Sequence, residues 1–339
     1  VNPATGERPS EVSRFFAGTW EQRTAQWRER LQDCKQKLAP LQALAERNQM
    51  WDRFALLADY VQRAEALLAK EPADPGAALG ALDAAWAELS YTLPWWESVF
   101  LDDRTLFADL NLDLAGLAAV KAAVAGGDFP AARVALLEYL RARTKPSWYG
   151  KHEGLPLRQP TGKRDAKADQ LLTHKHPIHD YKEPTFDLGP ELDWHVFPII
   201  DVEWPTQLHR HFHWSTLGAA YRQTGCEDYA KELRLQLLDW AQDNPLERWD
   251  AQRYRWSWST LNTTIRLYSS WIDMWLQTRN SPNWTPDAQF VFLAALREHG
   301  RFLMTHAARQ GNWVVAEARG LVELGILFPE FREAEQWRN

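Results

Sequence analysis

Apolar residues recur at helical spacing through almost the whole chain, and this pattern limits the fold more than any other sequence feature. Successive stretches carry apolar residues three and four positions apart, and Gly or Pro turns separate them. No segment shows the alternation of a β-strand array or a strand–helix–strand rhythm. Because consecutive helices joined by short turns pack as antiparallel pairs, we predict an all-α protein built of helical hairpins. Pairs wrapped into a toroid are the most natural closed arrangement.

Turn residues mark the individual hairpins. Gly126-Gly127 is expected to end one helix and to lead into its partner, and Thr224-Gly225 has the same role further on. The Thr285-Pro286-Asp287 sequence is typical of a helix start. Helices are therefore predicted over 114–125, 129–142, 207–224, 229–240, 258–275 and 287–309.

The first hundred residues carry helical patterns but no residues that suggest chemistry. Helices are predicted over 11–38, 41–70 and 77–89, and residues 91–96 depart from the helical pattern. We divide the chain into an N-terminal helical extension, residues 1–104, and a second helical domain, residues 105–339.

Composition argues against several classes of protein. The formal net charge is −6, whereas nucleic-acid-binding proteins show a basic field. No apolar run reaches the roughly 18 residues that a membrane span needs. Cys34 and Cys226 are too few for a disulfide framework, and we predict that both are buried. The 19 Trp outnumber the 14 Phe and the 9 Tyr, so we expect most Trp in the core and a few in a sugar-binding cleft.

Residues 145–200 form a long irregular stretch, because seven prolines interrupt it. Its Lys and His residues fit a solvated loop. His174 and His176 could bind a metal from one strand face, but no Cys or carboxylate cluster completes a ligand set, so no metal is predicted.

A dense group of polar residues lies on the helix predicted to start near Gln207. His209 and His213 are four residues apart and share one face of that helix, with Arg210 and His211 pointing elsewhere. One interpretation is an amphipathic helix with a His-rich polar side. The other is a set of donors that converge on an anionic sugar.

The stretch Gly311-Asn312-Trp313-x-x-x-Glu317-x-x-Gly320-Leu321 reads as a helix entered from a Gly-Asn step. Val314, Val315, Ala318 and Leu321 would form its apolar stripe. Asn312 stands where a helix-capping residue is favoured, so capping is one interpretation of it, with Glu317 pairing with a nearby cation. A role of Asn312 in a functional site is the other.

Several of these motifs, in the same order, resemble the heparinase II/III family of polysaccharide lyases. The similarity runs over about residues 105–337 and is carried by segments 203–214, 220–225, 239–245, 258–266 and 311–321 and by Phe328-Pro329-Glu330-Phe331. The family often has Asn at the position of His209 and Glu-Ala-Gly at Asn262-Thr263-Thr264. These departures concern specificity more than fold.

The resemblance implies an incomplete (α/α) toroid followed by a β-sandwich that is absent from this chain. It also implies β-elimination at a uronic acid, with Asn312 neutralising the uronate carboxylate and a catalytic Tyr and His lying beyond Asn339. No metal or cofactor is required. The expected partner is an acidic polysaccharide of the heparan sulfate type or a less sulfated one. We expect a periplasmic or secreted location, although no signal peptide is visible in this chain.

The candidate catalytic residue is Asn312. The candidate substrate-binding residues are Gln207, Arg210, His211, His213, Trp214, Arg266 and Trp313. Two alternatives remain open. A glycoside hydrolase would need two carboxylates across the bond, and Asp201 and Glu203 are the only acids near the His-rich segment. A non-catalytic polysaccharide-binding domain would explain the Trp and His residues without a base.

Overall fold

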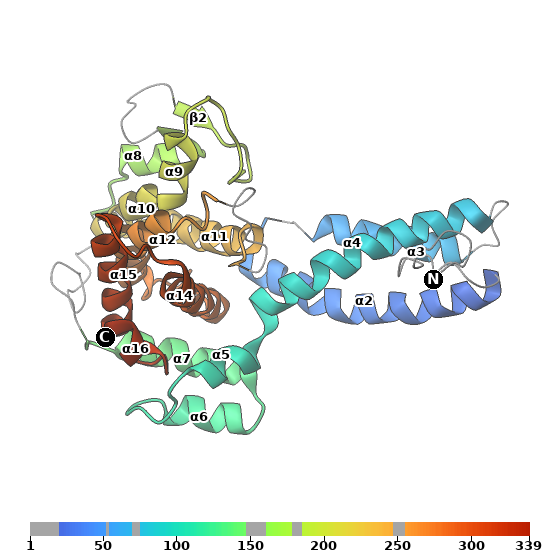
Figure 1. Ribbon diagram of the computed structural model, residues 1–339, viewed down its shortest axis with the longest axis horizontal. Helices are drawn as coiled ribbons and strands as arrows, with labels where there is room; N and C mark the ends of the chain where they lie inside the picture. Colours follow the sequence, from blue (N-terminus) through green and yellow to red (C-terminus); the bar gives the residue numbers. More distant parts are fainter. Residues whose placement is uncertain (1–19, 52–53, 70–74, 147–160, 178–184, 247–254) are drawn as a thin grey trace. The chain divides into compact units, whose positions relative to one another are not determined.

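The computed structural model describes residues 20–51, 54–69, 75–146, 161–177, 185–246 and 255–339, and these residues are mostly helical (Figure 1). They separate into two compact units. The first consists of residues 1–47 and 52–101, and the second of residues 48–51 and 102–339. The all-α prediction is confirmed, with one two-stranded ribbon as the only sheet in the described parts.

The described residues of the first unit form α2 (Trp20–Asn48), α3 (Ala55–Leu68) and α4 (Pro75–Leu101). Two predicted interruptions are wrong, because α2 continues through Pro40 and α4 through Pro94. Both prolines are exposed, so the backbone groups that lose a hydrogen bond can face water. The predicted start of the first helix at residue 11 lies outside the described residues.

The second unit begins with α5 (Asp103–Asp109), α6 (Ala118–Ala125) and α7 (Phe129–Ala142), and α6 packs on α7 as the predicted hairpin. Next come α8 (Ala166–Leu171) and the antiparallel strands β1 (Lys175–Pro177) and β2 (Thr185–Asp187), which pair His176 with Phe186. This ribbon lies in the stretch that was expected to be irregular.

Residues 188–202 are turns and bends without regular structure. From Glu203 onward the described residues are mostly helical, and their elements are α9 (Glu203–Arg210), α10 (Phe212–Thr224), α11 (Glu227–Asp243), α12 (Thr260–Arg266), the π-helix η2 (Leu267–Trp271), α13 (Ile272–Thr278), α14 (Pro286–His306), α15 (Trp313–Leu327) and α16 (Ala334–Arg338). Helix α14 contacts α7, α11, α12 and α15, and the sequential pairs α6–α7, α10–α11 and α15–α16 pack on each other. This arrangement is the incomplete helical toroid that was expected.

Side-chain caps explain why several helices begin where they do. Thr285 accepts a hydrogen bond from the backbone N–H of Ala288 at the start of α14, as its sequence predicts. The predicted Gly225 cap is also present, with φ of 70° at the end of α10. At the starts of other helices, the N-cap side chains also accept hydrogen bonds from backbone N–H groups; these caps are Asp102, Asp128, Asp165 and Ser259.

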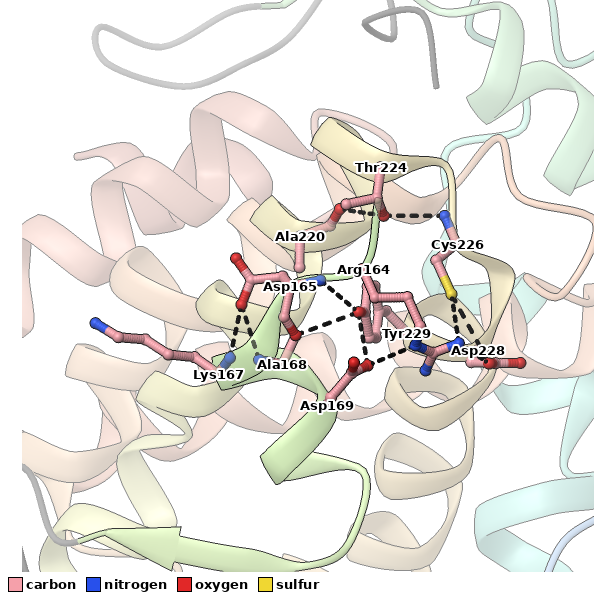
Figure 2. A network of polar contacts seen from close by, with 10 residues as sticks. All are labelled: Arg164, Asp165, Lys167, Ala168, Asp169, Ala220, Thr224, Cys226, Asp228 and Tyr229. Atoms are coloured by element: carbon pink, nitrogen blue, oxygen red, sulfur yellow. Dashed lines mark hydrogen bonds and ion pairs between the residues drawn. The ribbon is translucent and has the colours of Figure 1, made fainter. Parts of the chain in front are cut away.

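A polar network fastens the start of α8 to α11 (Figure 2). Arg164 bonds the carboxylates of Asp169 and Asp228, each at 2.8 Å. The Tyr229 hydroxyl donates to Asp169 at 2.8 Å and accepts from the Asp165 N–H at 3.0 Å. Cys226 lies beside this network and is only half-buried, so its predicted full burial is wrong, whereas Cys34 is buried.

Candidate substrate site

The His-rich segment is two helices rather than the single helix predicted. His211 separates α9 from α10 and has φ of 55° and ψ of 34°. His is one of the few residue types enriched in this left-handed region. The break removes the four-residue relation between His209 and His213, so these side chains do not share one helix face.

Each of the three histidines finds a partner inside the unit. The indole N–H of Trp240 donates to Nδ1 of His209 at 3.2 Å, and the indole N–H of Trp271 donates to Nδ1 of His211 at 2.8 Å. Since Nδ1 accepts in both, the imidazole proton is assigned to Nε2. His213 Nε2 lies 2.8 Å from the side-chain oxygen of Gln236.

Burial keeps these imidazoles neutral. It holds the pKa of His209 and His211 well below the ordinary value, and the nearby Arg266 guanidinium lowers both further. The pKa of His213 is lowered to about 4, again mainly by burial. The segment therefore does not present cationic His donors to an anionic sugar.

Arg266 lies in the centre of the same core. Its guanidinium donates to Nε2 of His299 at 2.6 Å and to the backbone carbonyls of Ser257 and His209. The charge also lies over the ring of Trp240, at 4.6 Å. Burial lowers the pKa of Arg266 well below its ordinary value.

Direct substrate contact was predicted for His211, Trp214 and Arg266, and this structure argues against it. All three side chains have 0% exposure, so no face is left for a ligand. Most of their polar atoms are used internally, as when the indole N–H of Trp214 donates to Gln236. Nε2 of His211 is buried without a hydrogen-bond partner among the described residues. These residues belong to the core that supports the site. His213 differs, because the residue as a whole is half-buried, but its imidazole is shielded from water strongly enough to lower its pKa.

Arg210, at the end of α9, is different, because its side chain is only half-buried. Its Nε–H donates to Oδ1 of Asn262 at 3.0 Å, and Asn262 is itself fixed by a bond to the backbone carbonyl of Trp256. Burial lowers the pKa of Arg210, and the Glu203 carboxylate opposes that effect. No carboxylate forms a salt bridge with Arg210 in the described part of the chain.

This arrangement suits an external anion. The two terminal nitrogens of Arg210 have no hydrogen-bond partner among the described residues, and guanidinium groups recognise carboxylates and sulfates well. The sequence did not identify Asn262 as a site residue, because its role depends on the α9–α12 contact. Gln207, one turn earlier on α9, donates to Glu203 at 3.3 Å.

Asn312 precedes α15 but does not cap it. It occupies the N-cap position with helical φ and ψ, and its side chain makes no capping hydrogen bond. The side chain is exposed, and no hydrogen bond joins it to another described residue. Trp313, the next residue, is 48% exposed. The amide and the indole are therefore both accessible to a ligand.

The predicted apolar stripe of α15 is not its buried face. Val315 is 75% exposed and Ala318 is also exposed. Glu317, Gly320 and Leu324 face inward instead. The periodicity was misleading because the inward face carries two carboxylates and two glycines among its apolar residues, as the full list shows: Glu317, Gly320, Glu323, Leu324, Gly325 and Leu327.

Helix α12 connects the two accessible groups. It packs on α9 through Asn262 and Arg210, and on α15 through Thr264, whose hydroxyl donates to the carbonyl of Ala316 at 2.8 Å. A Cβ at Gly320 would stand 2.0 Å from Oγ1 of Thr264, so only glycine allows this approach. The contacts with α9 and α15 therefore come from residues two apart on one helix.

The Phe328-Pro329-Glu330-Phe331 motif has a structural role. Both oxygens of Glu330 accept from the guanidinium of Arg143, at 2.7 and 2.9 Å, and one also accepts from the Tyr139 hydroxyl. Phe328 and Phe331 are buried. The motif thus fixes the end of α15 against α7.

No group of three or more His, Cys, Asp or Glu side chains is placed to hold a metal ion within the described ranges. In the same residues, no helix is long and apolar enough to cross a membrane.

Comparison with known proteins adds independent information. Residues 106–339 match the model of the heparinase II/III N-terminus. The chain is 35% identical over 253 residues to a heparin-sulfate lyase of Bacteroides stercoris, covering 69% of this chain and 37% of that protein. It is 33% identical over 244 residues to a heparin-sulfate lyase of Pedobacter heparinus, covering 70% of this chain and 36% of the relative. The chain thus spans a little over a third of each of these relatives.

Solved structures show the same similarity. A heparinase III with methylated lysines has a TM-score of 0.62 at 33% identity, over 70% of this chain and 38% of that one. The heparan sulfate lyase HepC from Pedobacter heparinus has a TM-score of 0.61, also at 33% identity, over 69% of this chain and 37% of its own. With its helical toroid and the match over residues 106–339, the chain belongs to the heparinase II/III family.

Proposed function

We propose that this chain is the helical part of a polysaccharide lyase that cleaves a uronic-acid-containing glycan, of the heparan sulfate type, by β-elimination. The observation that carries the proposal is the state of Asn312: exposed, without a capping bond, and placed at the start of a helix that is fixed by its neighbours. The names of the relatives support the reaction class.

The chemistry explains why an unpaired amide matters. Removing the proton next to the uronate carboxylate builds negative charge on that carboxylate. A donor such as the Asn312 amide stabilises the charge as it develops, provided that it is already in position and not already bonded. Trp313 can stack on a sugar ring, and Arg210 can bind a carboxylate or sulfate. The base and the acid are not assigned to residues of this chain.

No specific observation favours the two alternatives, a glycoside hydrolase and a non-catalytic polysaccharide-binding domain. Asp201 and Glu203, the acids considered for a hydrolase, are engaged locally: Asp201 accepts from the Glu203 N–H at 2.9 Å, and Glu203 accepts from Gln207. A purely binding role would use the same accessible groups but would produce no unsaturated product. We also propose a periplasmic or secreted location, because a polymeric acidic glycan does not cross a membrane intact.

The test is Asn312→Ala in the full-length protein, followed by the ultraviolet absorbance of the unsaturated uronate. Loss of one preorganised donor should lower turnover about 10²- to 10³-fold. The melting temperature should stay almost unchanged, because no capping bond is lost. Gln310→Ala, also exposed and in the same turn, is the matched control and should keep full turnover. An active but destabilised Asn312→Ala protein would return Asn312 to a capping role.

A further inference from the structure

The turn that carries Asn312 is tied down by a residue further along α15. Residues 307–312 connect α14 to α15, and Gly311 takes φ of 91°. The backbone N–H of Ala308 donates to Oε2 of Glu317 at 2.6 Å. Glu317 is 1% exposed, so this bond lies inside the unit. The turn is thereby held against the first turns of the helix that it precedes.

We propose that Glu317 is a positioning residue that sets the place of the Asn312 amide. This inference rests on the proposed function. Ala308 lies four residues before Asn312, and its N–H is held by Glu317. Ala316 lies four residues after Asn312, and its carbonyl is held by Thr264. Asn312 itself needs no bond, because the backbone is fixed on both sides of it.

The surroundings of the Glu317 carboxylate indicate that it positions the turn rather than adding to the stability of the fold. Its Oε1 atom is buried without a hydrogen-bond partner in the described structure, and no cation forms a salt bridge with the carboxylate there. The sequence-based expectation that Glu317 pairs with a cation is therefore wrong. A buried carboxylate with one bond is costly, and an apolar side chain would be more favourable at such a place. The carboxylate supplies something that an apolar residue cannot, namely an acceptor for the Ala308 N–H.

This contact also explains the spacing of the sequence motif. Gly311 provides the positive φ of the turn, Asn312 presents the amide, Glu317 closes the turn, and Gly320 permits the approach of Thr264. Only Asn312 among these four faces the solvent with an unpaired functional group.

The experiment compares Glu317→Ala with Glu317→Gln in the full-length protein. Hydrogen exchange of the Ala308 amide measures the anchor, and kcat and KM measure its effect on the reaction. Glu317→Ala should accelerate Ala308 exchange and lower kcat about 10- to 100-fold, since misplacement of a catalytic group by about 1 Å has such an effect. Glu317→Gln keeps a side-chain carbonyl acceptor and should restore most of both. Glu323→Gln changes another buried carboxylate of α15 and should alter neither.

A second variant tests the same bond from its donor side. Ala308→Pro removes the N–H and leaves Glu317 in place, and Ala307, with ψ of 147°, already has a backbone suited to precede proline. It should lower kcat as Glu317→Ala does, which covers the case in which Glu317→Ala fails to fold.

Each outcome has one interpretation. Unchanged Ala308 exchange in Glu317→Ala would overturn the anchor, and faster exchange with full kcat would overturn its role in positioning. A wild-type protein that yields no unsaturated product, yet shows the predicted exchange differences, would instead contradict the proposed function and leave the anchor intact.

Discussion

Two short polar segments interrupt the helices: the break between α9 and α10, and the turn before α15. The polar side chains are buried at the break, whereas Asn312 is exposed at the turn. At the break, His209 and His211 are buried and accept bonds from Trp indoles. At the turn, Asn312 is exposed and has no bond to the described chain. The density of polar residues is therefore a poor guide to a binding site. What distinguishes the two regions is how many partners the protein itself provides.

The largest expected effect sharpens this comparison with two arginines on neighbouring helices. Arg266→Met should lower the free energy of unfolding by about 3–5 kcal/mol, because it leaves His299 and two backbone carbonyls unpaired in the core. Arg210→Met should cost about 1 kcal/mol or less, since that side chain is half-buried and makes one bond to Asn262.

Chemical denaturation of both variants measures the difference. The effect on substrate affinity should be reversed. Arg210→Met should weaken binding, whereas the Arg266→Met protein that remains folded should bind substrate as the wild type does. An Arg266→Met protein as stable as the wild type would mean that the desolvation of the guanidinium cancels its bonds.

Acid should destabilise the core before it affects the turn. The unfolded chain protonates His at about pH 6.5, whereas burial lowers the folded pKa of five histidines, that of His213 to about 4. A lowered folded pKa means that the stabilisation is complete above the unfolded value. It is then lost at roughly 1.4 kcal/mol per histidine per pH unit as the pH falls toward the folded value. The five are His176, His209, His211, His213 and His299.

Calorimetric melting between about pH 7 and pH 4 tests this expectation. His174 acts in the other direction: burial lowers its pKa, but the bond to Glu232 outweighs burial and raises it, so its contribution is lost as the pH rises. His209→Gln, which keeps an acceptor for Trp240, should reduce the slope by one histidine. A melting temperature independent of pH in this window would contradict the neutral His core.

The smallest expected effect concerns the exposed indole. Trp313→Ala should raise KM about fivefold, equivalent to about 1 kcal/mol, because it removes a stacking surface of ordinary strength. Since the side chain is 48% exposed, stability should change by no more than about 0.5 kcal/mol. Trp313→Phe retains an aromatic face and serves as the control. An unchanged KM in Trp313→Ala would remove this residue from the proposed site.

Local patterns predicted the helical class, the α6–α7 hairpin and the caps at Thr285 and Gly225, because each depends on residues close in sequence. They failed at Pro40 and Pro94, where exposure decides whether a helix tolerates proline. They also failed at His211, where a left-handed backbone residue ends α9 and α10 begins. Of the proposed site, Asn312 was identified through family resemblance. The parts played by Asn262 and Glu317 depend on contacts between segments, which periodicity does not contain.

The ultraviolet fluorescence emission of this protein should follow from the distribution of its indoles. Trp194, Trp214, Trp240, Trp258 and Trp271 are buried almost completely, whereas Trp313 is half open to water. Emission should therefore be dominated by a blue-shifted population that reports on unfolding and on the charge state of the neighbouring imidazoles. Among the indoles of the described residues, that of Trp313 should be the most accessible to a soluble quencher such as iodide. Protection from this quenching by an acidic oligosaccharide would provide an optical signal from the turn.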